Sequence, residues 1–142
     1  MDDLGDDSFL GNVADLLSLM PFAGTLGVAL DSATRGEVRG HLDWAPNLCT
    51  AGGLLHGGAL MALADSLGGI CAYLNLPPGA QTATISSATS FIHGIRDGTV
   101  AAVSRPLHAG RTVIVVRTDL FDGTARLVAQ VTQAQAVLAR PA

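Results

Sequence analysis

The stretch LLHGGALMALADSLGGICAYL, residues 54–74, limits what this chain can fold into more than any other segment. A helix formed from it is apolar on nearly every side, so other parts of the protein have to cover it. It makes a poor membrane span, because Asp65 near its centre would cost about 2.5–3.5 kcal/mol on an insertion scale and its four glycines weaken it further. We therefore expect a helix at the centre of a folded domain, and no membrane as a partner.

The segments on either side of this helix predict what covers it. Alternating apolar and polar residues at 26–44 predict a hairpin that turns at DSATRG, residues 31–36. The sequence NLPPGA ends the helix, and four β-like runs joined by short turns follow it. These runs are residues 81–92, 98–109, 111–121 and 125–139. Strands joined by short turns form an antiparallel sheet, so we expect an α+β fold in which that sheet wraps around one long central helix.

Length and composition favour one domain that associates with copies of itself. A chain of 142 residues suits a single domain spanning residues 1–142. Residues 1–22 are expected to be a helical segment, with apolar residues at helical spacing from Ser8 to Met20 and Pro21 as the stop. Apolar residues make up 49% of the chain and charged residues only 14%, so an unusually large surface has to be covered. We therefore expect a homo-oligomer, either a homodimer or a homotetramer.

Charge and cysteine content argue against several kinds of partner. The net charge of -4 speaks against nucleic acid and anionic membranes, which reward clustered positive charge. The acidic start MDDLGDDSFLG lacks the basic region of a secretory signal, so we expect a cytoplasmic protein in which Cys49 and Cys71 are reduced. No group of His, Cys and Asp has zinc-binding spacing, so we expect no metal. A Gly-x-Ser-x-Gly elbow and a P-loop are both missing from the sequence.

Asp65 lies on the side of the predicted helix that faces away from the sheet. On a helical wheel it is opposite the apolar stripe that we expect to contact the strands, which consists of Leu60, Leu63, Leu67, Ile70 and Leu74. The neighbours of Asp65 on its own face are small, so a ligand or a second subunit could approach closely; they are Ala62, Gly69 and Ala72.

The start of the helix lacks a residue of the usual capping type. His56 precedes it and Gly57 offers no side-chain acceptor, so its first N–H groups are expected to be free for an anion. Acyl transfer needs a carboxylate that attacks a carbonyl or draws a proton from water, and N–H donors that stabilise the oxyanion. One such donor stabilises the transition state by ~2.7–4 kcal/mol. The alternative is that a buried Asp65 only hydrogen-bonds a neighbouring loop and the glycines only permit tight packing. About 12 Å of helix separates Gly57 from Asp65, so one shared site would need two antiparallel helices from two subunits.

The motif HGGALMALAD, residues 56–65, resembles that of the hotdog-fold acyl-CoA thioesterases, in the branch of phenylacetate-pathway, aroyl-CoA and menaquinone-pathway enzymes. The resemblance runs from about Asn47 to Leu138, with PLHAGR as a weaker second match. It implies the hotdog fold and the hydrolysis of an acyl-CoA to free acid and coenzyme A, with no cofactor because coenzyme A is part of the substrate. The acyl group it implies is aromatic, such as hydroxybenzoyl, dihydroxynaphthoyl or phenylacetyl, or else medium-chain aliphatic.

The resemblance also implies roles for individual residues. Asp65 matches the catalytic carboxylate, which is a nucleophile or a general base. Gly57 matches the residue whose N–H polarises the thioester carbonyl, supplied by the other subunit, and His56 matches the motif histidine near that carbonyl. Contacts with the substrate and coenzyme A fall on Thr50, Thr84, Phe91, Ile92, His93, Gly94, His108, Ala109, Gly110, Arg111 and Thr112.

Two positions depart from the family pattern. Thr50 stands where many relatives have Gln or Asn, and Gly69 stands where many have a hydroxylated residue. These departures leave open a non-hydrolytic acyl-CoA-binding protein of the same fold. A second alternative is an enoyl-CoA hydratase of this fold, although the Asp–His pairing of that branch is not evident. Arg111 lies in a turn near the expected mouth for coenzyme A, and either pairs with phosphate or is a solvated surface charge.

Overall fold

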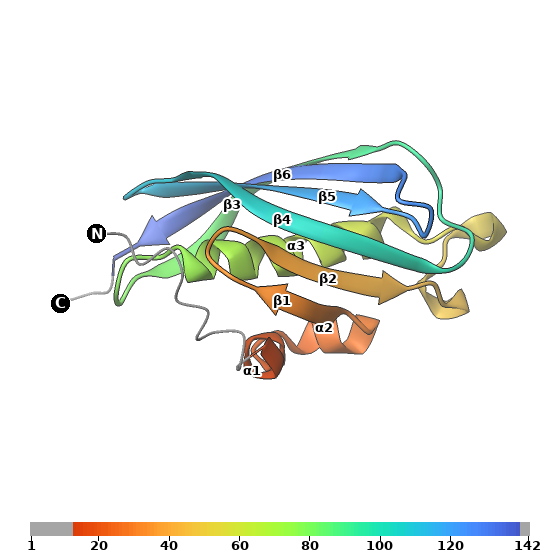
Figure 1. Ribbon diagram of the computed structural model, residues 1–142, viewed down its shortest axis with the longest axis horizontal. Coiled ribbons are helices and arrows are strands. Elements are labelled where there is room, and N and C mark those ends of the chain that lie inside the picture. Colours follow the sequence, from red (N-terminus) through yellow and green to blue (C-terminus); the bar gives the residue numbers. More distant parts are fainter. Residues whose placement is uncertain (1–12, 140–142) are drawn as a thin grey trace.

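The computed structural model describes residues 13–139, and shows a six-stranded antiparallel sheet laid along one long helix (Figure 1). Its elements are α1 Val13–Ser18, α2 Pro21–Leu26, β1 Ala29–Ala33, β2 Val38–Asp43, the short helices η2 Pro46–Leu48 and η3 Ala51–Gly53, α3 Gly57–Leu74, β3 Gln81–Phe91, β4 Thr99–Ala109, β5 Val113–Phe121 and β6 Leu127–Leu138. The strand order is β1-β2-β4-β5-β6-β3, so β3 forms one edge of the sheet. The predicted α+β fold, with its sheet wrapped around a central helix, is confirmed.

The N-terminal segment differs from the prediction. The helix expected at residues 8–20 begins outside the described residues, and its described part, α1, ends at Ser18. The helix α1 ends three residues before Pro21, as a stop signal would require, but Pro21 also begins α2, where its missing N–H and fixed φ do no harm. Gly27, in the left-handed conformation at φ 86°, then closes α2. The helix α1 packs against β1, and α2 packs against α1 and α3 (Figure 1).

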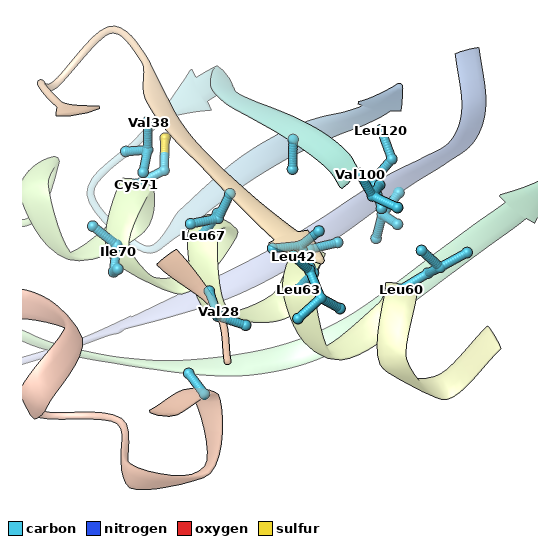
Figure 2. Close-up of a cluster of buried hydrophobic side chains, with 14 of the residues drawn as sticks. Val28, Val38, Leu42, Leu60, Leu63, Leu67, Ile70, Cys71, Val100 and Leu120 are labelled. Carbon is cyan, nitrogen blue, oxygen red and sulfur yellow. The ribbon is translucent and has the colours of Figure 1, made fainter. Parts of the chain in front are cut away.

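The apolar stripe predicted on α3 forms the centre of the core. Leu60, Leu63, Leu67, Ile70 and Leu74 are all buried. Figure 2 shows the α3 side chains together with buried residues of the strands, among them Leu42, Val100 and Leu120. Burying a side chain of this size contributes about 1.5–3 kcal/mol. The helix is long and apolar enough to resemble a membrane span, but 61% of it is buried inside the domain, as in the core helix of a globular protein.

Within residues 13–139, nothing covers one face of α3 or the β3 edge of the sheet. On α3 the exposed residues are Gly58, Met61, Asp65 and Tyr73, which follow one another at helical spacing. On the sheet, β3 pairs only with β6 and leaves its other edge free. Large apolar side chains near this edge are exposed, with Ile85 at 64% and Phe91 at 53%. An open edge and an apolar surface are the features that proteins normally cover with another element or another chain.

Candidate active site

His56 is the residue that caps α3. Its backbone is extended, at φ -60° and ψ 134°, and its side chain accepts a hydrogen bond from the N–H of Gly58 through Nδ1 at 2.8 Å. The prediction of a helix start without a capping side chain, with Gly57 as the cap, is therefore wrong. The physical reason is that an unprotonated imidazole nitrogen accepts a backbone N–H in the same way as the oxygen of the common caps.

This cap fixes how the remaining polar groups of the helix start are arranged. Because Nδ1 accepts, the proton of a neutral imidazole lies on Nε2, which becomes a second donor at the helix start. Within residues 13–139, no acceptor binds the N–H of Gly57. The helix start thus offers the Gly57 N–H, with the positive end of the helix dipole behind it, to an incoming oxygen.

A hollow of about 290 Å³ opens beside this helix start. Six of the residues predicted to bind or position the substrate line it, from three separate parts of the chain: Thr50, Gly57, Phe91, Ile92, His93 and Gly94. Backbone bonds hold its walls, since Leu55 donates to the Ile95 carbonyl at 2.9 Å. The ring of Phe91 lies so close to Gly57 that a Cβ there would meet its Cζ at 3.1 Å. A side chain at position 57 would therefore need the ring of Phe91 to shift.

Asp65 is exposed in the single chain, which corrects the expectation of a buried acid. Its Oδ1 accepts a hydrogen bond from Nε2 of Gln133 on β6 at 3.1 Å. Its Oδ2 has no partner among the described residues. Because Gln133 comes from the inner face of the sheet, Asp65 lies where the covered part of α3 meets its exposed face. Within one chain it lies two turns of helix beyond Gly57, which is too far for both groups to reach one carbonyl.

The predicted coenzyme A turn lies at the other end of α3. Ala109, Gly110 and Arg111 line a second hollow of about 410 Å³, together with Arg35 and residues 75–78 that follow the helix. Two guanidinium groups in one hollow suit a phosphate-bearing ligand. Because α3 has 18 residues, its length of about 27 Å separates this hollow from the one beside His56.

The remaining predicted residues lie close to this turn or on β3. Thr112 accepts from the backbone N–H of Val137 through its carbonyl at 2.9 Å, which fixes the turn to β6. His108 lies over Gly110, where a Cβ would come within 2.6 Å of Nε2. Thr84 lies on β3 and accepts a hydrogen bond from the Gln135 side chain at 2.9 Å. Most of the predicted residues thus fall into two groups, one at each end of α3, while Asp65 lies in the middle of the helix and Thr84 lies on β3.

Gln133 and Arg35 were not predicted as site residues. Gln133 is 1% exposed, yet it is a polar residue on the inner face of a strand. The sequence carried a signal for it, because alternation in VAQVTQAQAVLA places Gln133 and Gln135 on the same face as the buried Val131. A buried amide needs a partner, and that need points towards the carboxylate on the helix. No signal in the sequence brings Arg35 to Arg111, because the closeness of their turns depends on the fold.

Comparisons with known proteins identify the family of this chain. The model of the thioesterase superfamily matches residues 52–129. The protein Rv1847 of Mycobacterium tuberculosis is 30% identical over 120 residues, which are 82% of this chain and 86% of that protein. The 1,4-dihydroxy-2-naphthoyl-CoA hydrolase of Escherichia coli K12 is 35% identical over 75 residues, 53% of this chain and 55% of that protein.

The solved structures show the same architecture. A mutant of thioesterase PA1618 from Pseudomonas aeruginosa superposes with a TM-score of 0.84 at 25% identity, over 89% of this chain and 93% of that one. The matched residues 52–129 contain the capped helix start, the carboxylate and the strands around them. The chain therefore belongs to the thioesterase superfamily and has the hotdog fold that its HGG motif indicated.

Proposed function

We propose that this protein is an acyl-CoA thioesterase that hydrolyses its substrate to a free acid and coenzyme A, in active sites shared between two subunits. The observation that carries the proposal is the pairing on α3 of a free N–H at Gly57 with an exposed, oriented carboxylate at Asp65. Each group serves one need of thioester hydrolysis, and both the N–H of Gly57 and Oδ2 of Asp65 lack a hydrogen-bond partner within the described residues. Activity on thioesters is also supported by membership of the superfamily.

The surfaces left uncovered support a homodimer. Two β3 edges that pair across a twofold axis would extend the sheet and cover the exposed Ile85. The same operation would bring two α3 helices side by side in opposite directions. Asp65 of one subunit would then face the N–H of Gly57 from the partner, and the two hollows at opposite ends of α3 would come together at each site. Further pairing of dimers into a homotetramer is compatible with this arrangement.

In such a site the thioester carbonyl oxygen accepts from the N–H of Gly57, with the Nε2–H of His56 beside it. Asp65 either takes a proton from water as the water oxygen bonds to the carbonyl carbon, or attacks that carbon itself and forms a mixed anhydride, which water then cleaves to the free acid and the Asp65 carboxylate. In both routes the C–S bond breaks and coenzyme A leaves as the thiolate, which then gains a proton. Single turnover in oxygen-18 water distinguishes the routes, since label in Asp65 indicates the anhydride.

The acyl group is the finer part of this proposal. We propose an aromatic acyl group or a medium-chain aliphatic one, because the hollow beside the helix start is lined mostly by apolar side chains and includes the ring of Phe91. An aromatic acyl group is also the substrate that the name of the Escherichia coli relative states for that enzyme. A panel of aromatic and aliphatic acyl-CoAs, ranked by kcat/KM, identifies the preferred class. We place the reaction in the cytoplasm and assign it no cofactor.

The decisive experiment measures thiol release from acyl-CoAs by the purified protein and by Asp65→Asn. The variant keeps the shape of the side chain but lacks the basic oxygen, so we expect kcat to fall by at least about 100-fold. Asp31→Asn is the matched control, because Asp31 is also exposed but pairs with His41 on the β1–β2 hairpin. A parent that releases no thiol from any acyl-CoA, or an Asp65→Asn variant as active as the parent, refutes the proposal. Binding of acyl-CoA without turnover would instead favour the non-hydrolytic alternative.

A further inference from the structure

We infer that Gln133 is a positioning residue that holds Asp65 with one oxygen anchored and the other directed to the substrate. The inference rests on the proposed thioesterase function. Its first observation is the single hydrogen bond from Nε2 of Gln133 to Oδ1 of Asp65 at 3.1 Å. The donor lies on β6 and is 1% exposed, while the acceptor is exposed on α3. The buried side chain of Gln133 thus holds the exposed side chain of Asp65.

Gly68 makes this hydrogen bond possible. It lies on α3 three residues after Asp65, and a Cβ built on it would overlap Oε1 of Gln133 and come within 2.6 Å of its Cδ. Any other residue at position 68 would therefore push the amide out of its place. A glycine inside a helix costs about 1 kcal/mol relative to alanine. This less favourable residue stands at the turn of α3 over which the amide of Gln133 lies.

The chemistry of the two groups fixes which atoms meet. An ionised carboxylate has only acceptors, so the amide must turn its NH₂ group towards Asp65 and its carbonyl away. Oδ1 is then occupied and the plane of the carboxylate is set. Oδ2 keeps its lone pairs free of any partner in the described part of the chain, and it is the oxygen that attacks the thioester carbon or takes the proton from water.

This orientation leaves the carbonyl oxygen of the Gln133 amide without a hydrogen bond. Oε1 of Gln133 is buried and accepts no hydrogen bond within residues 13–139. A methionine at this position would fill nearly the same volume without burying a carbonyl, and Asp65 at the surface could bind water instead. For the stability of the fold alone, methionine would therefore suit this position at least as well as glutamine. This separates a positioning role from a structural one by experiment.

The first test compares Gln133→Met with the parent protein. We expect kcat to fall on the order of 100-fold, because the attacking oxygen is no longer held in line, while KM changes less than about twofold. We expect the melting temperature to stay the same or rise. Gln130→Met is the matched control, because Gln130 also lies on β6 and donates to a carboxylate, that of Asp119, at 2.8 Å. An unchanged kcat in Gln133→Met, or an equal loss in Gln130→Met, overturns the inference.

The second test is Gly68→Ala, alone and combined with Gln133→Met. If the alanine methyl acts by displacing the amide, Gly68→Ala lowers kcat in the parent protein. In a protein that already carries Gln133→Met, the same change then has little further effect on kcat. Should Gln133→Met fail to fold, Gly68→Ala decides the matter, and an unchanged kcat overturns the inference. Independent effects of the two changes on kcat also overturn it.

Crystal structures of the parent and of Gln133→Met give a readout that does not depend on turnover. We expect one rotamer of Asp65 in the parent and several in the variant. A parent with a single Asp65 rotamer but no thioester hydrolysis refutes the proposed function alone. An active parent whose Gln133→Met variant keeps both its kcat and a single Asp65 rotamer refutes this inference alone.

Discussion

A mixed dimer tests whether each active site takes Gly57 from one subunit and Asp65 from the other. Two inactive variants are combined, Gly57→Pro and Asp65→Asn, each with its own affinity tag. Proline lacks the N–H and suits the first position of a helix, so α3 is preserved; its ring needs Phe91 to shift, because a Cβ at position 57 already meets that ring at 3.1 Å. Phe91 is 53% exposed and can move. Loss of this donor should reduce kcat about 10²–10³-fold in the Gly57→Pro homodimer.

In the mixed dimer the two sites differ. One combines both defects, and the other combines the intact Gly57 of one chain with the intact Asp65 of its partner. Purification through both tags should therefore give about half the kcat of the parent dimer, although each homodimer is nearly inactive. The control pairs the parent chain with a chain that carries both changes, in which neither site is intact. Activity in the control but not in the mixed dimer would show that each site lies within one chain, and would refute the shared-site reasoning.

Two further predictions concern stability. At equal protein concentration, His56→Ala should lower the free energy of unfolding in urea by about 0.5–2 kcal/mol, because the Gly58 N–H loses its acceptor. His56→Asn keeps an acceptor for this N–H and should lower the free energy of unfolding less. Equal losses in the two variants would show that the hydrogen bond to Nδ1 does not stabilise α3. Hydrogen bonds from the Thr124 side chain, and from the Arg126 and Thr124 backbone, lower the pKa of Asp122 from 3.8 to about 2. Because the folded pKa is the lower one, Asp122 should stabilise the protein above pH 4 and lose this effect as pH falls towards 2. The difference in urea midpoint between the parent and Asp122→Asn should therefore shrink between pH 7 and pH 2; a constant difference would contradict the linkage.

The architecture could be predicted from the sequence because its signals are local and strong. The apolar run that becomes α3 needs a sheet to cover most of its surface, and Pro77 and Pro78 follow soon after its end. The four strand runs are separated by turn residues, so their number and approximate limits follow from the chain itself. The start of α2 at Pro21 was not predicted, because a proline both ends helices and begins them, and only the path of the backbone shows which of these it does.

The site could be predicted in its residues but not in its contacts. The motif identified His56, Gly57 and Asp65, yet the cap at His56 depends on a rotamer that no sequence pattern specifies. Whether Asp65 is buried depends on what covers α3, and its hydrogen bond to Gln133 joins residues 68 positions apart. Contacts of this kind arise from packing between helix and sheet, and residue type alone does not determine them.

The place of β3 at the edge of the sheet has a consequence for how the chain folds during synthesis. Its only neighbour within the chain is β6, and Gln81 at the start of β3 pairs with Leu138 at the end of β6. A ribosome that adds 5–20 residues per second needs about 2–7 s to pass from the end of β3 to the start of β6. During that time both edges of β3 are unpaired, and its apolar side chains are available to neighbouring nascent chains. The sheet can close only after β6 has been made, so a chain truncated before Leu127 should aggregate rather than fold into a smaller domain.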